Sequence, residues 1–174
     1  MLRGYMACSA DGYIADAEGG IGFLDAFDGV DFGYDAFYAG IDSLIMGRAT
    51  FDQVRGFDLP WPYGGKPCHV MTSTDLSDPP EGVSRWTGSL ADYATAMRGK
   101  TAWVVGGARL QADFIAAGLL DRLTLFVMPL LLGRGVALFP QGDAATSLVL
   151  SETQTYDRGV VRLDYRLAGK AADV

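Results

Sequence analysis

The sequence predicts an α/β protein with a mixed, mainly parallel sheet. Short apolar runs that suit buried strands alternate with helical patterns through the first two thirds of the 174 residues. Two strand-like runs joined by the hairpin signal Asp157-Arg158-Gly159 then close the chain. No internal repeat interrupts this order. We therefore expect one domain over residues 1–174, with helices on both faces of the sheet and an antiparallel carboxy-terminal edge.

The strands and helices of this domain are expected at twelve positions. Strands are predicted at Leu2–Ala10, Ser43–Met46, Cys68–Met71, Val83–Trp86, Ala102–Val105, Leu123–Leu132, Leu148–Tyr156 and Val160–Leu167. Short helices are predicted at Asp31–Gly40 and at Leu90–Met97, the second with Ser89 as its cap. Further helices follow Gly47 and Gly107, and Asp11–Gly29 is predicted to be a long glycine-rich loop.

The composition limits the partners and the location of the protein. A formal charge of −7 and a pI near 4.5 argue against nucleic-acid binding, which needs a basic patch. No run of 18 apolar residues predicts a membrane span, and Asp11 and Asp16 interrupt any signal-peptide pattern. We therefore expect a cytoplasmic protein that binds neither membrane nor nucleic acid. Cys8 and Cys68 lie in apolar runs far apart in sequence, which indicates buried free thiols and no metal site.

The stretch from Thr101 to Leu123 carries the strongest functional signal. A strand at Ala102–Val105 runs into Gly106-Gly107, and a helix that begins near Ala108 continues through Arg109 and Leu110 to a stop at Gly118. Glycines lack a Cβ atom, so a ligand can lie against the backbone, and the free N–H groups of a helix start favour an anion such as phosphate. A tight turn without a ligand is the alternative.

Two further signals fall at strand ends. Gly47 and Thr50 begin a helix that can hold a pyrophosphate, and Arg48 can reach a phosphate with its guanidinium fork. Thr72 and Ser73 place hydroxyl groups after another strand. Because ligands of such sheets bind outside the carboxyl ends of the strands, these signals together predict a nucleotide cleft.

Four segments, taken in order, carry a resemblance to a known family: SADGYIAD, DSLIMGRATF, TAWVVGGARL and DRLTLFVMPLLLGRGVALF. Together they resemble the C-terminal reductase domain of the bifunctional riboflavin-biosynthesis deaminase/reductase, in the dihydrofolate reductase-like superfamily. The resemblance implies that superfamily's three-layer fold, NADPH as cofactor and a homodimer. It also implies hydride transfer to a small heterocyclic or ribosylated aminopyrimidine-type substrate, as in a 5-amino-6-(5-phosphoribosylamino)uracil reductase. The deaminase half is absent, because the chain has no His-x-Glu with Pro-Cys-x-x-Cys.

The resemblance also assigns candidate site residues. It places Ile14 and Ala15 in a loop over the nicotinamide. The adenosine half would be held by Gly47, Arg48, Thr50, Thr72 and Ser73, and the nicotinamide and pyrophosphate by Gly106, Gly107, Ala108, Arg109 and Leu110.

Two carboxylates are the candidates for catalysis. Asp11 is the first candidate for substrate contact or proton handling, and Asp31 is the second. For Asp31, a favourable charge in the first turn of a helix is the alternative. Arg134 is a candidate for a substrate anion or, equally, a solvated loop residue.

Two other functions are compatible with the same fold. One is dihydrofolate reduction, although Phe23-Leu24-Asp25 stands where dihydrofolate reductases have Leu-Pro-Trp after the Gly20-Ile21-Gly22 loop. The other is a nucleotide-binding module without catalytic activity.

Overall fold

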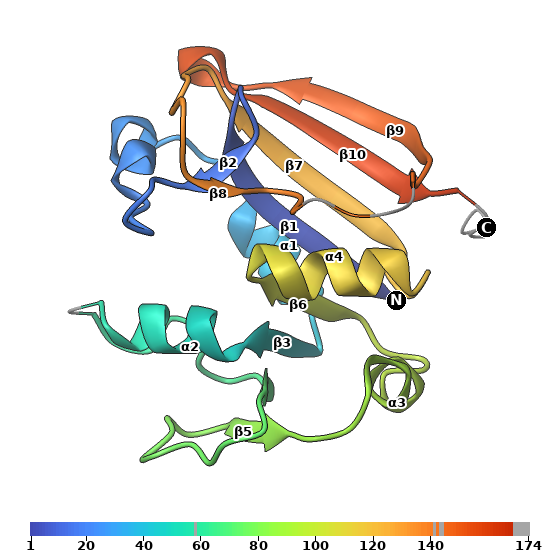
Figure 1. Ribbon diagram of the computed structural model, residues 1–174. Helices are drawn as coiled ribbons and strands as arrows, with labels where there is room; N and C mark the ends of the chain where they lie inside the picture. The colour runs from blue at the N-terminus through green and yellow to red at the C-terminus, as the bar shows by residue number, and fades with distance from the viewer. Residues whose placement is uncertain (58, 141, 143–144, 169–174) are drawn as a thin grey trace.

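The computed structural model of the protein describes residues 1–57, 59–140, 142 and 145–168 (Figure 1). Eight strands form one sheet in the order β5-β4-β3-β6-β1-β7-β10-β9, and β2 pairs with β8 in a separate small sheet. The strands are β1 Leu2–Ser9, β2 Tyr13–Ala15, β3 Ser43–Gly47, β4 Cys68–Met71, β5 Val83–Trp86, β6 Ala102–Gly106, β7 Arg122–Met128, β8 Val136–Ala137, β9 Leu148–Thr155 and β10 Val161–Leu167. The helices are η1 Gly22–Phe27, α1 Tyr34–Ala39, α2 Arg48–Arg55, α3 Leu90–Ala96, α4 Ala108–Ala116 and η2 Asp157–Gly159.

The sheet is parallel from β5 to β7 and antiparallel at β10 and β9, which confirms the predicted fold class. Each parallel pair needs a crossover, and the helices supply most of these. The last two strands need only the turn around η2, so they pair as a hairpin.

Three apolar clusters hold helices to both faces of the sheet. On one face, α3 and α4 bury Tyr93 and Phe114 against Met6, Ile45 and Val104. On the other face, α1 and α2 bury Phe37 and Phe51 against the alternate residues of β3, β4 and β6. Residues of η1 pack near Phe126 and Met128 of β7 on this second face. Figure 1 shows α4 in front of β1 and α1 behind it, so the sheet is the middle of three layers.

Three of the predicted element boundaries were wrong. The first helix begins at Tyr34, not at Asp31, because Gly33 has a φ of 73° and the Asp31 carboxylate accepts a hydrogen bond from the Gly33 amide. The strand after Asp121 ends at Met128, since Pro129 has no N–H group and Leu130 N–H turns back to the Met128 carbonyl. The stretch Asp11–Gly29 is not all loop, because it contains β2 and η1.

Other local signals are confirmed. Ser89 caps α3, with its hydroxyl accepting from the Asp92 amide and the Asp92 carboxylate accepting from the Ser89 amide. Gly118, with a φ of 64°, follows the end of α4. Cys8 and Cys68 are buried free thiols, and burial raises the pKa of Cys8 to about 11 and that of Cys68 to about 12. No helix in the described ranges is both long and apolar enough to cross a bilayer.

Candidate active site

A cleft opens where two neighbouring strands of the sheet separate. The register of β1 with β6 ends at the pair Gly4–Val104, although β1 continues to Ser9 and β6 to Gly106. Tyr5, Met6 and Ala7 then line one side of the opening, and Val105 and Gly107 line the other. The cleft has a volume of about 880 Å³, within the usual range for small-molecule sites. It lies at the carboxyl ends of the parallel strands, where the sequence predicted it.

The floor of the cleft is built from glycines of two adjacent strands. A Cβ atom added to Gly47 would lie 4.0 Å from the Gly107 nitrogen, so the ends of β3 and β6 meet there. A Cβ added to Gly107 would lie 3.2 Å from the Thr50 hydroxyl oxygen. The bond between Gly106 and Gly107 is a cis peptide. The missing side chains leave backbone atoms open to a ligand.

Two helices begin at this floor without side-chain caps. Gly47 is the N-cap of α2 and Gly107 is the N-cap of α4, and neither cap makes a side-chain hydrogen bond. The helix α3, whose first residues do not line the cleft, has a complete capping box. The first-turn amides of α2 and α4 therefore remain available to a ligand, and both helix dipoles favour a negative group. The geometry suits a pyrophosphate.

A small sheet covers the cleft. Ile14 and Ala15 of β2 and Val136 and Ala137 of β8 line it from above. These two strands fit closely because Gly135 has no side chain, and a Cβ atom there would overlap the carbonyl oxygen of Ala15. The cover is also tied to α2, because the Gln53 amide nitrogen donates to the Gly19 carbonyl oxygen at 2.7 Å.

Hydroxyl and guanidinium groups gather beyond the floor, at the ends of β4 and β5. Arg48 Nη1 donates to the Thr74 hydroxyl at 2.9 Å, and Arg48 Nε pairs with Asp52. Arg85 Nη1 pairs with Asp75 at 2.8 Å and donates to the Ser73 carbonyl at 3.4 Å. A shallow hollow here is lined by Thr72, Ser73, Arg85 and Met71, and Met71 also lines the cleft. The cleft therefore continues towards two cationic side chains.

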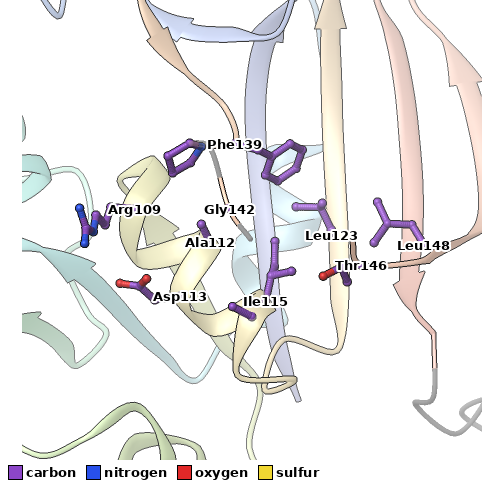
Figure 2. Close-up of a pocket in the computed structure, with 11 residues that line it drawn as sticks. Arg109, Ala112, Asp113, Ile115, Leu123, Phe139, Gly142, Thr146 and Leu148 are labelled. Carbon is purple, nitrogen blue, oxygen red and sulfur yellow. The ribbon is translucent and has the colours of Figure 1, made fainter. Parts of the chain in front are cut away.

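A second hollow, of about 460 Å³, lies beside α4 (Figure 2). Figure 2 shows Arg109 and Asp113 at one side and Leu123, Thr146 and Leu148 at the other. Arg109 and Asp113 also line the cleft, so the hollow joins the cleft at the start of α4.

Neither of the two predicted catalytic carboxylates lines the cleft. Asp11 accepts hydrogen bonds from the Ser9 hydroxyl and from the amides of Leu132 and Gly133, which ties the turn after β1 to the loop after β7. The Ser9 hydroxyl is the main cause of a lowered pKa for Asp11, and the two amides act in the same direction. Asp31 is exposed and binds the Gly33 amide.

Most of the other predicted site residues come together. The residues that line the cleft are Ile14, Ala15, Gly47, Arg48, Thr50, Gly107, Ala108, Arg109 and Leu110. Gly106 precedes them in the glycine floor, and Thr72 and Ser73 lie in the adjoining hollow. Sequence reasoning missed Tyr5, Ile21, Leu24 and Gln53 in the cleft and Arg85 beside it. For Gln53 a signal existed, because it follows Ala49 by one helical turn on the face that carries the cleft.

Comparison with known proteins shows the family of the chain. The uncharacterised Bacillus subtilis protein YwjB is 34% identical over 160 residues, which covers 90% of this chain and 92% of YwjB. The profile of the RibD C-terminal domain matches residues 88–162. The chain belongs to the RibD C-terminal domain family.

Two solved structures of RibD-like proteins share the fold. A putative riboflavin biosynthesis protein from Shewanella sp. PV-4 is 30% identical, covers 95% of this chain and 98% of its own, and has a TM-score of 0.85. The Thermotoga maritima diaminohydroxyphosphoribosylaminopyrimidine deaminase/5-amino-6-(5-phosphoribosylamino)uracil reductase is 14% identical, with a TM-score of 0.72. The match covers 97% of this chain but 56% of the Thermotoga protein. The fold of these two proteins is thus shared along nearly the whole chain.

Proposed function

We propose that the protein is an NADPH-dependent reductase that transfers a hydride to a small heterocyclic substrate, of which ribosylated aminopyrimidines are one kind. The observation that carries this proposal is the meeting of two uncapped helix starts over a floor of glycines. Such a floor with free amides fits the pyrophosphate of a dinucleotide. Family membership supports the reductase class.

The residues of the chain would position the cofactor and exclude water. Gly47, Gly107 and the Thr50 hydroxyl would hold the pyrophosphate, and the covering strands β2 and β8 would shield the nicotinamide. NADPH, when bound, supplies the hydride. Asp11 would act as a positioning residue that fixes the loops beneath β2 and β8, while a direct substrate contact by Asp31 stays a prediction. By resemblance to its family, we propose that the protein is a homodimer.

The first test adds a side chain to one of the glycines that form the floor of the cleft. Gly107→Ala should lower NADPH affinity by about tenfold or more, because the new methyl group would occupy the place of the ligand beside Thr50. The φ of Gly107 is −68°, which alanine adopts, so only the Thr50 side chain has to shift, by a few tenths of an ångström. Titration of NADPH by quenching of tryptophan fluorescence measures the change.

Gly64→Ala is the matched control for this experiment, because a Cβ atom at Gly64 meets open space. It should leave the affinity unchanged. Tight NADPH binding by a folded Gly107→Ala protein would contradict the proposed site, and wild-type protein that binds no NADPH would contradict the function.

A second test addresses the choice between NADPH and NADH. Arg85 and Arg48 bracket the hydroxyl groups of Thr72–Thr74 and would bind the adenosine 2′-phosphate of NADPH. Arg85→Ala should weaken NADPH binding by about ten- to a hundredfold and leave NADH binding unchanged. Arg98→Ala, at the exposed end of α3, is the control. Equal losses of affinity for NADPH and for NADH would contradict a role of Arg85 in binding the 2′-phosphate.

A further inference from the structure

A second binding site lies outside the cleft, in a hollow between α1 and the strands β1, β7, β10 and β9. We propose that this hollow binds a small organic anion, an oxyanion attached to a planar apolar group, and that Arg3 is its main hydrogen-bond donor. The hollow has a volume of about 400 Å³. Of the described residues only Tyr5 lines both the hollow and the cleft, so the proposal does not depend on the reductase function.

Three arginines form a row across this part of the sheet. Arg3 of β1 is in register with Arg122 of β7, and Arg122 is in register with Arg166 of β10. Residues paired in this way point to the same face of a sheet, and neighbouring like charges destabilise it. Arg3 and Arg122 both line the hollow. The row therefore concentrates positive charge at this site.

The two carboxylates in the hollow are engaged by other side chains. Arg162 Nε lies 2.6 Å from Asp164 Oδ2, and Arg162 Nη2 lies 2.9 Å from Glu152 Oε1. The other Asp164 oxygen accepts a hydrogen bond from the Thr124 hydroxyl at 2.6 Å. These carboxylates therefore offset the charge of Arg162. Neither of them forms an ion pair with Arg3.

Among the residues that the structure describes, the guanidinium of Arg3 has no hydrogen-bond acceptor. Its Nε atom is buried without a partner, and its Cζ atom lies 5.1 Å from the centroid of the Phe37 ring. The pKa of Arg3 is lowered by burial and next by the charge of Arg122, and the opposite effects of Asp164 and Tyr5 do not offset these two. A half-buried guanidinium without an acceptor costs stability. A bound anion would supply the acceptor and offset the repulsion from Arg122.

The helix side of the hollow determines what the anion is attached to. The cations of the hollow all lie on strands, whereas Phe32, Ala36 and Phe37 come from α1 and the segment before it. The acidic residues of that segment, Asp31 and Asp35, are exposed and do not line the hollow. Apolar side chains that face a guanidinium fit an aromatic ring that carries a carboxylate or a phosphate.

The test compares the binding of matched anionic and neutral compounds by calorimetric titration. One pair is benzoate and benzamide, and the other is phenyl phosphate and phenol. At least one anion should bind about tenfold more tightly than its neutral partner, because it makes charge-assisted hydrogen bonds to Arg3. Tighter binding of benzoate would identify the ligand as a carboxylate, and tighter binding of phenyl phosphate would identify it as a phosphate ester.

Arg3→Met assigns the binding to this hollow. Methionine keeps an unbranched apolar side chain over Phe37 but has no guanidinium, so the preference for the anion should be lost. Arg98→Met, at an exposed position just after α3, is the matched control and should keep the preference. In buffer without an organic anion, Arg3→Met should unfold at the same urea concentration as wild type or a higher one, because the repulsion from Arg122 is removed.

Two results would overturn the proposal. One is wild-type protein that binds neither anion in preference to its neutral partner, including the case in which Arg3→Met instead shifts the protein towards monomer in analytical ultracentrifugation. That shift would assign the hollow to contact with a second copy of the chain. The other is a preference for the anion that a folded Arg3→Met protein retains in full, which would place the binding at other arginines, such as Arg48 and Arg109 of the cleft.

Discussion

Asp11, which the sequence predicts to be catalytic, holds the turn after β1 and the loop after β7 together. Its carboxylate accepts a hydrogen bond from the Ser9 hydroxyl at 2.6 Å and another from the Gly133 amide at 2.7 Å. Both bonds favour the charged form and lower the pKa. Because the pKa of the folded state lies below that of the unfolded state, the stabilisation is complete above the unfolded value of about 3.9. It is lost as the pH falls through the lowered folded value.

We therefore expect Asp11→Asn to be less stable than wild type at pH 7, and the difference should disappear as the pH falls below about 3.9. Urea unfolding followed by circular dichroism from pH 7 to pH 3 measures this. Glu81→Gln, at an exposed carboxylate before β5, should show no comparable trend. A stability difference that does not begin to shrink between pH 4 and pH 3 would show that the charge of Asp11 is not the cause.

The side chain of Gln111 is buried in the core without a hydrogen-bond partner. It lies on α4 against Gly4 of β1, and both its side-chain nitrogen and oxygen are unpaired. An unpaired buried amide costs stability, and a side chain of similar shape without polar atoms avoids that cost. Gln111→Met should raise the free energy of unfolding by about 1 kcal/mol, measured by urea unfolding. A loss of stability would imply that a partner such as an internal water satisfies the amide.

At the scale of elements, the cover of the cleft depends on one glycine. Gly135 has a φ of 158°, and a side chain there would overlap Ala15. Gly135→Ala should separate β2 from β8, speed hydrogen exchange at Tyr13–Ala15 and weaken NADPH binding. Gly133→Ala is the matched control, since it has a φ of 75° but open space around it. Gly133→Ala should lower the free energy of unfolding by about 1 kcal/mol and leave hydrogen exchange in β2 unchanged. Similar effects of both variants would contradict a role for the close contact.

The strands and helices of the main sheet were predictable because each is set by local pattern. The apolar runs, the Ser89 cap and the glycine stop after α4 all lie within a few residues of the element they define. The small sheet was not predictable in the same way. Its strands lie at Tyr13–Ala15 and Val136–Ala137, too short for a periodic pattern and paired across more than a hundred residues of sequence.

The residues of the candidate site also fall into those that a local pattern predicts and those that depend on distant parts of the chain. Gly47, Gly107 and Thr50 were found because strand-glycine-helix junctions mark ligand sites in α/β sheets. Tyr5, Met6 and Ala7 were not, because three consecutive residues of one strand line a cleft only where the neighbouring strand has moved away. That separation comes from tertiary structure, and the alternation of side chains along a strand does not predict it.

At the scale of the whole molecule, the sheet has an open edge. All eight residues of β9 are exposed, and Leu148, Val149 and Leu150 form an apolar stretch there. An exposed apolar stretch on an edge strand pairs readily with other strands. We expect the proposed homodimer to use this edge, so Leu150→Lys should shift the protein towards monomer in analytical ultracentrifugation. A Leu150→Lys protein that sediments as wild type does would place the interface elsewhere.

The separation of β1 from β6 also divides the sheet as a whole. The strands β5, β4, β3 and β6 form one half, and β1, β7, β10 and β9 form the other. The pairs Leu2–Ala102, Arg3–Trp103 and Gly4–Val104 are the register that joins the two halves. The site at which a dinucleotide is proposed to bind therefore lies where the two halves of the sheet meet. A molecule bound there would contact both halves and stabilise their pairing, so we expect slower hydrogen exchange at Leu2–Gly4 when the cleft is occupied.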